Sequence, residues 1–450
     1  MWPLLTAISL FLFAFASASA QDYVNPIDSF IKQAVDQPPF ATGTLCSDEL
    51  FLRRATLDLW GRIPTADELA RFRIAPNRAK IIDQMLESDE FVSHWASLWT
   101  TQWYGYTTDD TADRASFRNW LETELKAKTP YDEVVHKLVT AQGQSAFVGP
   151  VSFFLRHAEE PVVKISRSFL GVRLDCARCH DHPFDRWTED DFQKMNLFFA
   201  GLQQREVSRG NVQLVDVVMQ AEASERPRFL TGAVPKTSQW RAEFAIFMIR
   251  SKPFARNFAN RIWYHLLGRG IVHPVDDFSR DNPPSHPELL EYLTAEVRKS
   301  KFDLRHMIRL ICASPAYQRV STAESNSSQL QQQFLIRSIK PLTPEQWYRS
   351  FCVATQRTAQ AEEEREFVRQ YLSDSIDGDF SATWEYRETM QGLMSALLDR
   401  AAPRGGDLDS HFTSTLGRSP TTQERDFFSH SSSREVSYVL LHSNEFSFNH

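Results

Sequence analysis

The chain has 450 residues, of which 42% are hydrophobic and 24% are charged, and its formal net charge at pH 7 is −7. A chain of this length has room for two or three domains with a sizeable core. The acidic balance argues against a general nucleic-acid binder, which would carry a basic surface. Five cysteines are too few for a fold built on disulfides.

Residues 1–20 have the features of a secretory signal peptide. An apolar run ends in Ala18-Ser19-Ala20, a small-x-small cleavage pattern, so the mature chain is predicted to begin at Gln21. The alternative is a membrane anchor, but the run is short for a span and ends in small residues. We therefore expect export to the periplasm or secretion, with no transmembrane span after cleavage.

Helical periodicity dominates the first half of the mature chain. The run over 90–103 carries an aromatic stripe, which at this spacing predicts core rather than a sugar or cofactor platform. A further apolar run over 160–172 leads into a cysteine motif, and Thr188 is predicted to cap the helix that follows it. The other predicted helices cover 25–37, begin at Ser47 and Thr65, and cover 78–86, 115–126 and 131–140.

The pattern changes between residues 203 and 235, where β-branched residues predict a small hairpin. Beyond it, helices are predicted over 239–250, 253–267, 286–299 and 304–313, and a Ser/Asn/Gln-rich linker over 321–334. Further helices are predicted over 343–355, 359–373, 383–399, 407–415, 421–430 and 434–442. The predicted fold is mostly α, with helical domains at 21–202 and 236–450 joined by a β-rich connector at 203–235.

The motif with the strongest chemical content is Cys176-Ala-Arg-Cys179-His180. Cys-x-x-Cys-His is the attachment sequence of c-type haem, in which two thiols bond the porphyrin and the histidine ligates iron. On a helix, the three residues would share one face. A low-spin electron carrier needs a second axial ligand, for which the candidates are Met195, Met219, His157 and His265.

The same residues allow other chemistry. Together with His182 they could form a zinc shell of Cys176, Cys179, His180 and His182, in a metal-dependent exported enzyme. A Cys176–Cys179 disulfide in a structural module is a third possibility. The spacing favours haem and leaves open whether the chain is an enzyme. The three remaining cysteines are predicted to be buried small hydrophobes: Cys46, Cys312 and Cys352.

Two groups of polar residues accompany the motif. Five carboxylates surround it: Asp181, Asp185, Glu189, Asp190 and Asp191. We predict that the first two fix the loop and orient an imidazole, and that the other three place negative charge at the start of the next helix. These roles are favoured over acid–base or metal chemistry. Four polar residues further along share one helical face: Asn257, Asn260, Arg261 and His265. They could line a polar pocket, but we favour the interpretation that they form a contact between the domains.

Several longer segments resemble known families. The first half contains Phe51-Leu-Arg-Arg54, Gly61-Arg-Ile-Pro64-Thr65 and Phe169-Leu-Gly-Val172 running into CARCHDHPFDRW, and the second contains Asn257-Phe-Ala-Asn260-Arg261 and Asn282-Pro-Pro-Ser-His286. These segments are similar to the second planctomycete cytochrome-c-like domain of unknown function and to the planctomycete-specific domain that follows it. The resemblance implies an exported protein of uncharacterised activity.

For this chain, the leading hypothesis is a c-type haem with an electron-transfer or redox role. Cys176 and Cys179 are the expected covalent anchors, and His180 is the expected proximal ligand. The expected partners are other exported redox or surface proteins.

Overall fold

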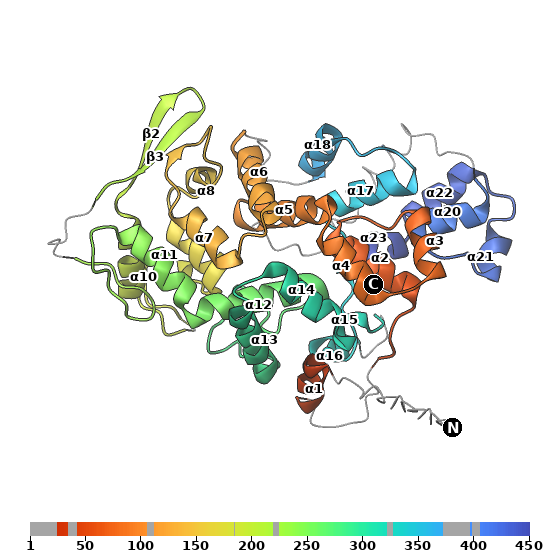
Figure 1. Cartoon of the computed structure of the whole chain (residues 1–450), viewed down its shortest axis with the longest axis horizontal. Helices are drawn as coiled ribbons and strands as arrows, with labels where there is room; N and C mark the ends of the chain where they lie inside the picture. The colour runs from red at the N-terminus through yellow and green to blue at the C-terminus, as the bar shows by residue number, and fades with distance from the viewer. Residues whose placement is uncertain are drawn as a thin grey trace, which may run out of the picture.

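The computed structural model describes residues 25–34, 43–105, 112–183, 185–218, 225–321, 327–371, 397 and 406–450. The predicted signal peptide, Met219 and, apart from Leu397, the predicted helix over 383–399 lie outside these ranges. The described residues form a mostly α fold with two small antiparallel sheets, as predicted (Figure 1). None of the described helices is both long and apolar enough to cross a bilayer.

The helices of the first half begin where polar caps are available. Ser47, Thr65 and Thr188 each accept a hydrogen bond from a backbone N–H in the first turn of the following helix, as predicted. The helices are α1 (Pro26–Gln33), α2 (Asp48–Leu59), α3 (Ala66–Ile74), α4 (Arg78–Leu86), α5 (Asp89–Trp103), α6 (Ala112–Lys126), α7 (Tyr131–Val139), α8 (Val151–Arg156), α9 (Pro161–Ile165) and α10 (Glu189–Asn196).

The predicted hairpin consists of β2 (Leu202–Ser208) and β3 (Asn211–Asp216). A two-residue strand that the sequence did not predict, β1 (Gly143–Gln144), pairs with the other edge of β3, so the strand order is β1-β3-β2. The hairpin projects from the body near α8 (Figure 1). All of β2 after Leu202 is exposed.

The second half is again mostly helical, and two short strands in it pair with each other. The predicted linker over 321–334 contains a short helix instead, and the hydrophobic residues that follow it, Phe334 and Leu335, are buried in the core. The elements are α11 (Trp240–Arg250), α12 (Lys252–Leu267), α13 (Pro287–Lys299), α14 (Leu304–Cys312), α15 (Pro315–Gln318), α16 (Ser327–Gln332), β4 (Lys340–Pro341), α17 (Pro344–Ala354), α18 (Ala361–Tyr371), α20 (Leu408–Leu416), α21 (Thr422–Phe427), α22 (Ser433–Leu441), α23 (Asn444–Ser447) and β5 (Phe448–Asn449).

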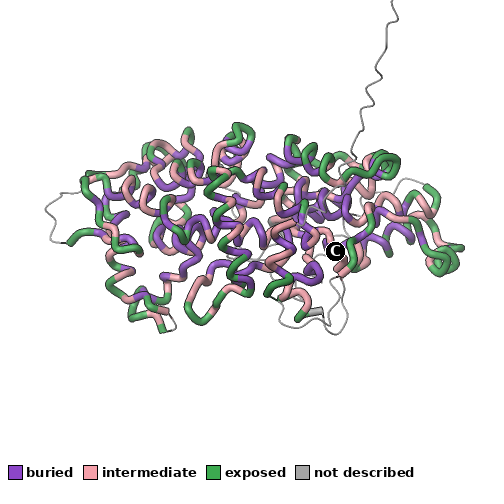
Figure 2. The backbone as a smooth tube through the Cα atoms, turned by 60° about the horizontal axis from the view of Figure 1, so that its bottom comes forward, coloured by how far each residue is buried: buried purple, intermediate pink, exposed green. Residues whose placement is uncertain are grey.

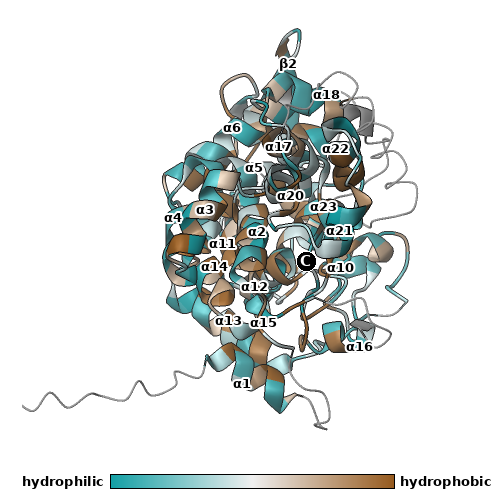
Figure 3. Ribbon diagram, turned by 90° about the vertical axis from the view of Figure 1, so that its right-hand side faces the viewer, coloured by the Kyte–Doolittle hydropathy of each residue, from teal (hydrophilic) through white to brown (hydrophobic). Residues whose placement is uncertain are grey.

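One large hydrophobic core runs through both halves of the chain, from Ile27 to Leu335. The Tyr131 ring in α7 stacks on Phe258 in α12 with the centroids 3.9 Å apart. The aromatic stripe of α5 lies in this core, as predicted, and buried segments run along the whole length of the molecule (Figure 2). Viewed along the long axis, hydrophilic and hydrophobic residues are mixed on the outer helices (Figure 3).

A second, smaller core joins α17, α20 and α22 to the other face of α2. All residues of α2 from Phe51 to Leu59 are buried, because the helix lies between the two cores. Its buried arginines donate to backbone carbonyl oxygens: Arg53 to Thr415 and Arg54 to His450. The last residues of the chain therefore lie against α2, where the C-terminus is marked in Figure 1.

Candidate functional site

The segment that leads into the cysteine motif is a π-helical turn, η1 (Ser166–Leu170), which continues directly from α9. It ends at Gly171, whose φ of 69° is in the left-handed region. The Gly171 carbonyl oxygen accepts a hydrogen bond from Phe278 N at 2.8 Å, and a Cβ here would come within 2.4 Å of the Phe278 ring. Glycine is thus required for this close approach between the two halves of the chain.

The motif itself forms a single 3₁₀ turn, η2 (Asp175–Ala177), followed by bends. No α-helix forms over the motif, so the condition under which both cysteines and His180 would share one helical face is not met. The loop is closed instead by a hydrogen bond from His182 N to the Trp187 carbonyl oxygen, at 2.8 Å. Ala177 and Trp187 are buried, whereas the side chains with haem- or metal-binding potential at Cys176, Cys179 and His180 are exposed. The turn is therefore anchored to the core by two buried side chains, and its two thiols and the imidazole face solvent.

The hydrogen bonding of His180 determines which ring nitrogen can bind a metal. Its Nδ1 lies 2.8 Å from the Asp181 carbonyl oxygen, and because a carbonyl can only accept, Nδ1 carries the proton. In the neutral ring, Nε2 then keeps its lone pair, the arrangement commonly found in metal-binding histidines. Within the described residues, Nε2 of His180 makes no hydrogen bond.

The carboxylates around the motif have structural roles, as predicted. Asp181 Oδ1 accepts from Glu189 N at 3.0 Å, and Asp185 Oδ1 accepts from Arg186 N at 2.8 Å. The side chains of Asp190 and Asp191, at the start of α10, both pair with Arg228. The loop is held by these contacts, and it is the Asp181 backbone that orients His180.

The structure does not gather the four proposed zinc ligands. Among the residues described, no three His, Cys, Asp or Glu side chains lie close enough together to hold a metal ion. Cys176 and Cys179 are also not joined by a disulfide. The other three cysteines are buried, as predicted, and burial raises the pKa of the Cys352 thiol to about 11.

The described candidates for a second iron ligand are engaged elsewhere. Met195 is fully buried in the core. His157 Nε2 lies 3.0 Å from the Trp103 carbonyl oxygen, and His265 Nε2 lies 3.3 Å from the Gln102 amide. Of the predicted haem site, the structure thus shows the exposed turn with its two thiols and one imidazole, but no second ligand for the iron among the described residues.

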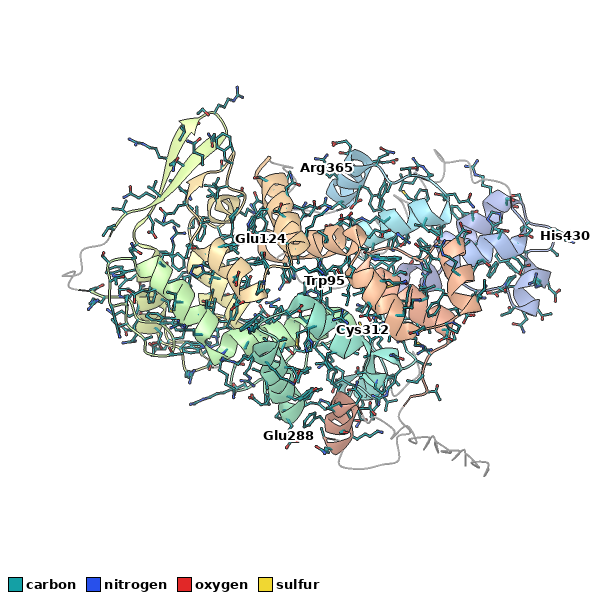
Figure 4. All side chains as sticks on the ribbon, in the orientation of Figure 1. Trp95, Glu124, Glu288, Cys312, Arg365 and His430 are labelled. Atoms are coloured by element: carbon teal, nitrogen blue, oxygen red, sulfur yellow. The ribbon has the colours of Figure 1, made fainter. Side chains whose placement is uncertain are left out.

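The polar face of α12 combines both predicted alternatives. Asn257 donates to the Ser168 carbonyl oxygen at 2.8 Å, and Asn260 pairs with the backbone of Val272, so these two make inter-element contacts. His265 instead lines a pocket of about 190 Å³ near the centre of the molecule, where Trp95 is labelled in Figure 4. Burial lowers the pKa of His265 to about 3. In the same pocket, burial lowers the pKa of Lys340 to about 8.

A larger pocket, of about 470 Å³, lies beside the motif and is called here the arginine pocket. Its wall connects directly to the motif, because Glu160 forms an ion pair with Arg178, between the two cysteines. The signal for it in the sequence is the set of charged residues over 156–167, a segment that overlaps the run 160–172, which is described above only as apolar. Its charged lining residues are Arg156, Glu159, Glu160, Lys164, Arg167, Arg261 and Asp276.

Asp276 ties this pocket to the segment before the motif. It accepts hydrogen bonds from Arg167 at 2.7 Å and from Arg173 at 2.7 Å. Burial acts to raise the pKa of Asp276, but the hydrogen bonds from the two guanidinium groups outweigh it and lower the pKa to about 2. Asp276 of the second half is therefore bonded both to η1, through Arg167, and to the segment that follows η1, through Arg173.

The fold and the site together define a mostly α protein in which both halves of the chain share one core, with a Cys-x-x-Cys-His turn exposed at its surface. The family model of PSCyt2, a protein of unknown function (DUF1549), matches residues 26–204, and that of PSD1, a protein of unknown function (DUF1553), matches residues 241–390. The chain belongs to the proteins that carry these two domains in this order. A comparison with curated proteins gives no match, and a comparison with solved structures gives none either.

Proposed function

We propose that this chain is an exported protein that holds a c-type haem at Cys176 and Cys179 and has an electron-transfer or redox role. The observation that carries the proposal is the exposed turn in which two unoxidised thiols stand beside an imidazole whose Nε2 keeps its lone pair. A bound haem would supply one-electron chemistry at its iron. His180 is the residue that would ligate that iron.

The exposure of both cysteines supports the proposal of covalent attachment. In thioether formation each thiol adds across a vinyl group, sulfur to one carbon and hydrogen to the other, so no oxidant is consumed. The reaction needs reduced thiols that a porphyrin can reach, and both cysteines are exposed and free of disulfides. The buried side chains of Ala177 and Trp187 anchor the turn to the core.

Export is part of the same proposal. The apolar run at residues 1–20 with its Ala18-Ser19-Ala20 ending supports cleavage of a signal peptide near Ala20. The mature chain would then reach the periplasm or the exterior, where c-type haem is attached. Amino-terminal sequencing of the secreted protein tests this step, and we expect it to begin at Gln21.

The attachment is tested by producing the full chain together with a cytochrome c maturation system. We expect a haem-stained band on a denaturing gel and an intact mass raised by one haem. Both signals should be lost in the double variant Cys176→Ala/Cys179→Ala. The variant Cys46→Ala is the matched control, because its thiol is buried away from the motif, and it should keep both signals.

An unstained wild-type chain contradicts the proposal, provided that a reference cytochrome is loaded in the same cells. Elemental analysis of that unstained protein then decides between the remaining alternatives. One zinc per chain, lost on Cys179→Ser, would support a metal-binding role for the motif.

A further inference from the structure

The arginine pocket plays no part in thioether attachment, and it has the size of a ligand site. Its volume of about 470 Å³ lies within the range of roughly 300–1,000 Å³ for small-molecule pockets. Gln102 and residues from the segment 155–168 of the first family domain form most of its wall, and Arg261 and Asp276 of the second complete it. The pocket therefore exists only when both domains are in place.

Two arginines leave hydrogen-bond donors unused in this pocket. Arg156, an exposed residue at the end of α8, makes no hydrogen bond or ion pair in the part of the chain that the structure describes. Arg167 donates from Nε and Nη2 to Asp276, so its Nη1 remains available as a donor. Guanidinium groups bind carboxylates and other oxyanions through paired, charge-assisted hydrogen bonds.

The acidic residues of the wall are largely neutralised. Three carboxylates line the pocket, and two of them are already paired: Asp276 with Arg167 and Arg173, and Glu160 with Arg178. Glu159 is the third. The lining also holds four cationic side chains, of which Arg167 is the one paired with Asp276, in a chain whose net charge is −7. The pocket is thus a local site for negative charge on an acidic protein.

We propose that the arginine pocket binds a ligand bearing two or more carboxylate groups, with Arg156 and Arg167 as the binding residues. The choice of ligand class rests on the proposed function, because a haem held on the adjacent turn carries two carboxylates. The other source of the same chemistry is a free di- or tricarboxylate. The Glu160–Arg178 ion pair joins the pocket wall to the motif and thus brings the pocket within reach of a group held there.

The test uses citrate as the probe in calorimetric titrations of the full-length chain produced without the maturation system. We expect citrate to bind with one site per chain. Arg156→Gln should weaken binding by about tenfold, because a charge-assisted contact is lost. Arg156→Lys, which keeps the charge without the planar fork, should give an intermediate loss. Arg209→Gln removes an exposed arginine from the hairpin and should leave binding unchanged.

Repeating the titration on haem-loaded protein distinguishes the two sources. Loss of citrate binding after loading shows that the carboxylates of the attached haem occupy the pocket, whereas retained binding shows a site for a free carboxylate. The inference is overturned if unloaded protein does not bind citrate, if Arg156→Gln binds it as well as wild type, or if pyrophosphate binds and citrate does not. Because the titration of unloaded protein needs no haem, its outcome is independent of the haem stain.

Discussion

Four donors from distant parts of the chain surround the Asp58 carboxylate. It accepts hydrogen bonds from Tyr317 at 2.9 Å, Arg337 at 2.9 Å and Asn449 at 2.8 Å, and it pairs with Lys340. The Arg337 side chain is fully buried. Asp58→Asn would leave that guanidinium without its counter-charge, so we expect the free energy of unfolding to fall by about 3–5 kcal/mol in urea titrations.

Asp83→Asn is the matched control for this substitution. Asp83 also pairs with an arginine, Arg309, but its side chain is 55% exposed. Exposed ion pairs contribute roughly 0–1 kcal/mol, so the control should lose less than about 1 kcal/mol. Equal losses of unfolding free energy in the two variants would contradict the role of Asp58 as the buried counter-charge of Arg337.

His286 makes stability depend on pH in the acid range. Burial lowers its pKa from 6.5 to about 4, so between these pH values the unfolded chain binds a proton that the folded chain does not. Stability therefore falls as the pH drops from 6.5 to 4, by about 3 kcal/mol from this residue. In unfolding experiments at pH 7 and pH 4.5, His286→Gln should lose less stability on acidification than wild type.

His430 provides the comparison for that experiment, because it is exposed and is labelled in Figure 4. His430→Gln should follow the wild-type pH dependence. A His286→Gln variant with the wild-type slope would contradict the assignment of acid sensitivity to this buried ring.

At the scale of elements, Gly171 joins the π-helical turn to the motif. In Gly171→Ala the new Cβ would meet the Phe278 ring and also occupy a left-handed backbone conformation, which itself costs roughly 1–2 kcal/mol. Gly210 has a similar φ of 75°, but a Cβ there would meet no described atom within 4 Å. We expect Gly171→Ala to lower the melting temperature more than Gly210→Ala, and equal shifts would contradict the close packing at Phe278.

The elements that could be predicted from the sequence are those determined locally. Ser47, Thr65 and Thr188 are recognisable as caps because a capping side chain bonds to its own first turn. The hairpin is recognisable from its β-branched run. The motif turn is not, because its shape depends on the bond from His182 to Trp187 and on buried Trp187, which sequence spacing does not reveal.

The same distinction applies to the candidate site. Cys176, Cys179 and His180 could be named from their spacing alone, and the structure places all three on one exposed turn. The arginine pocket could not be predicted, since Arg261 and Asp276 lie about a hundred positions from the other lining residues and only the shared core brings them together.

At the scale of the whole molecule, the two family domains share one core. Tyr131 stacks on Phe258 across the boundary, and Phe198 contacts Phe244 with ring centroids 5.2 Å apart. A fragment of residues 21–204 would expose these rings to water, so we expect it to lack a cooperative thermal transition by circular dichroism, whereas the full mature chain should show one. A cooperative transition in the fragment would show that the first domain folds alone.

The central claim is that Cys176 and Cys179 carry a haem, and the pyridine haemochrome spectrum of purified full-length protein tests it most directly. After production with a maturation system, we predict an α band at the position of a porphyrin with two thioether bonds, at one haem per chain. The band should be lost in Cys176→Ala/Cys179→Ala and retained in Cys46→Ala. A wild-type protein without this band, from cells that load a reference cytochrome, would contradict the claim.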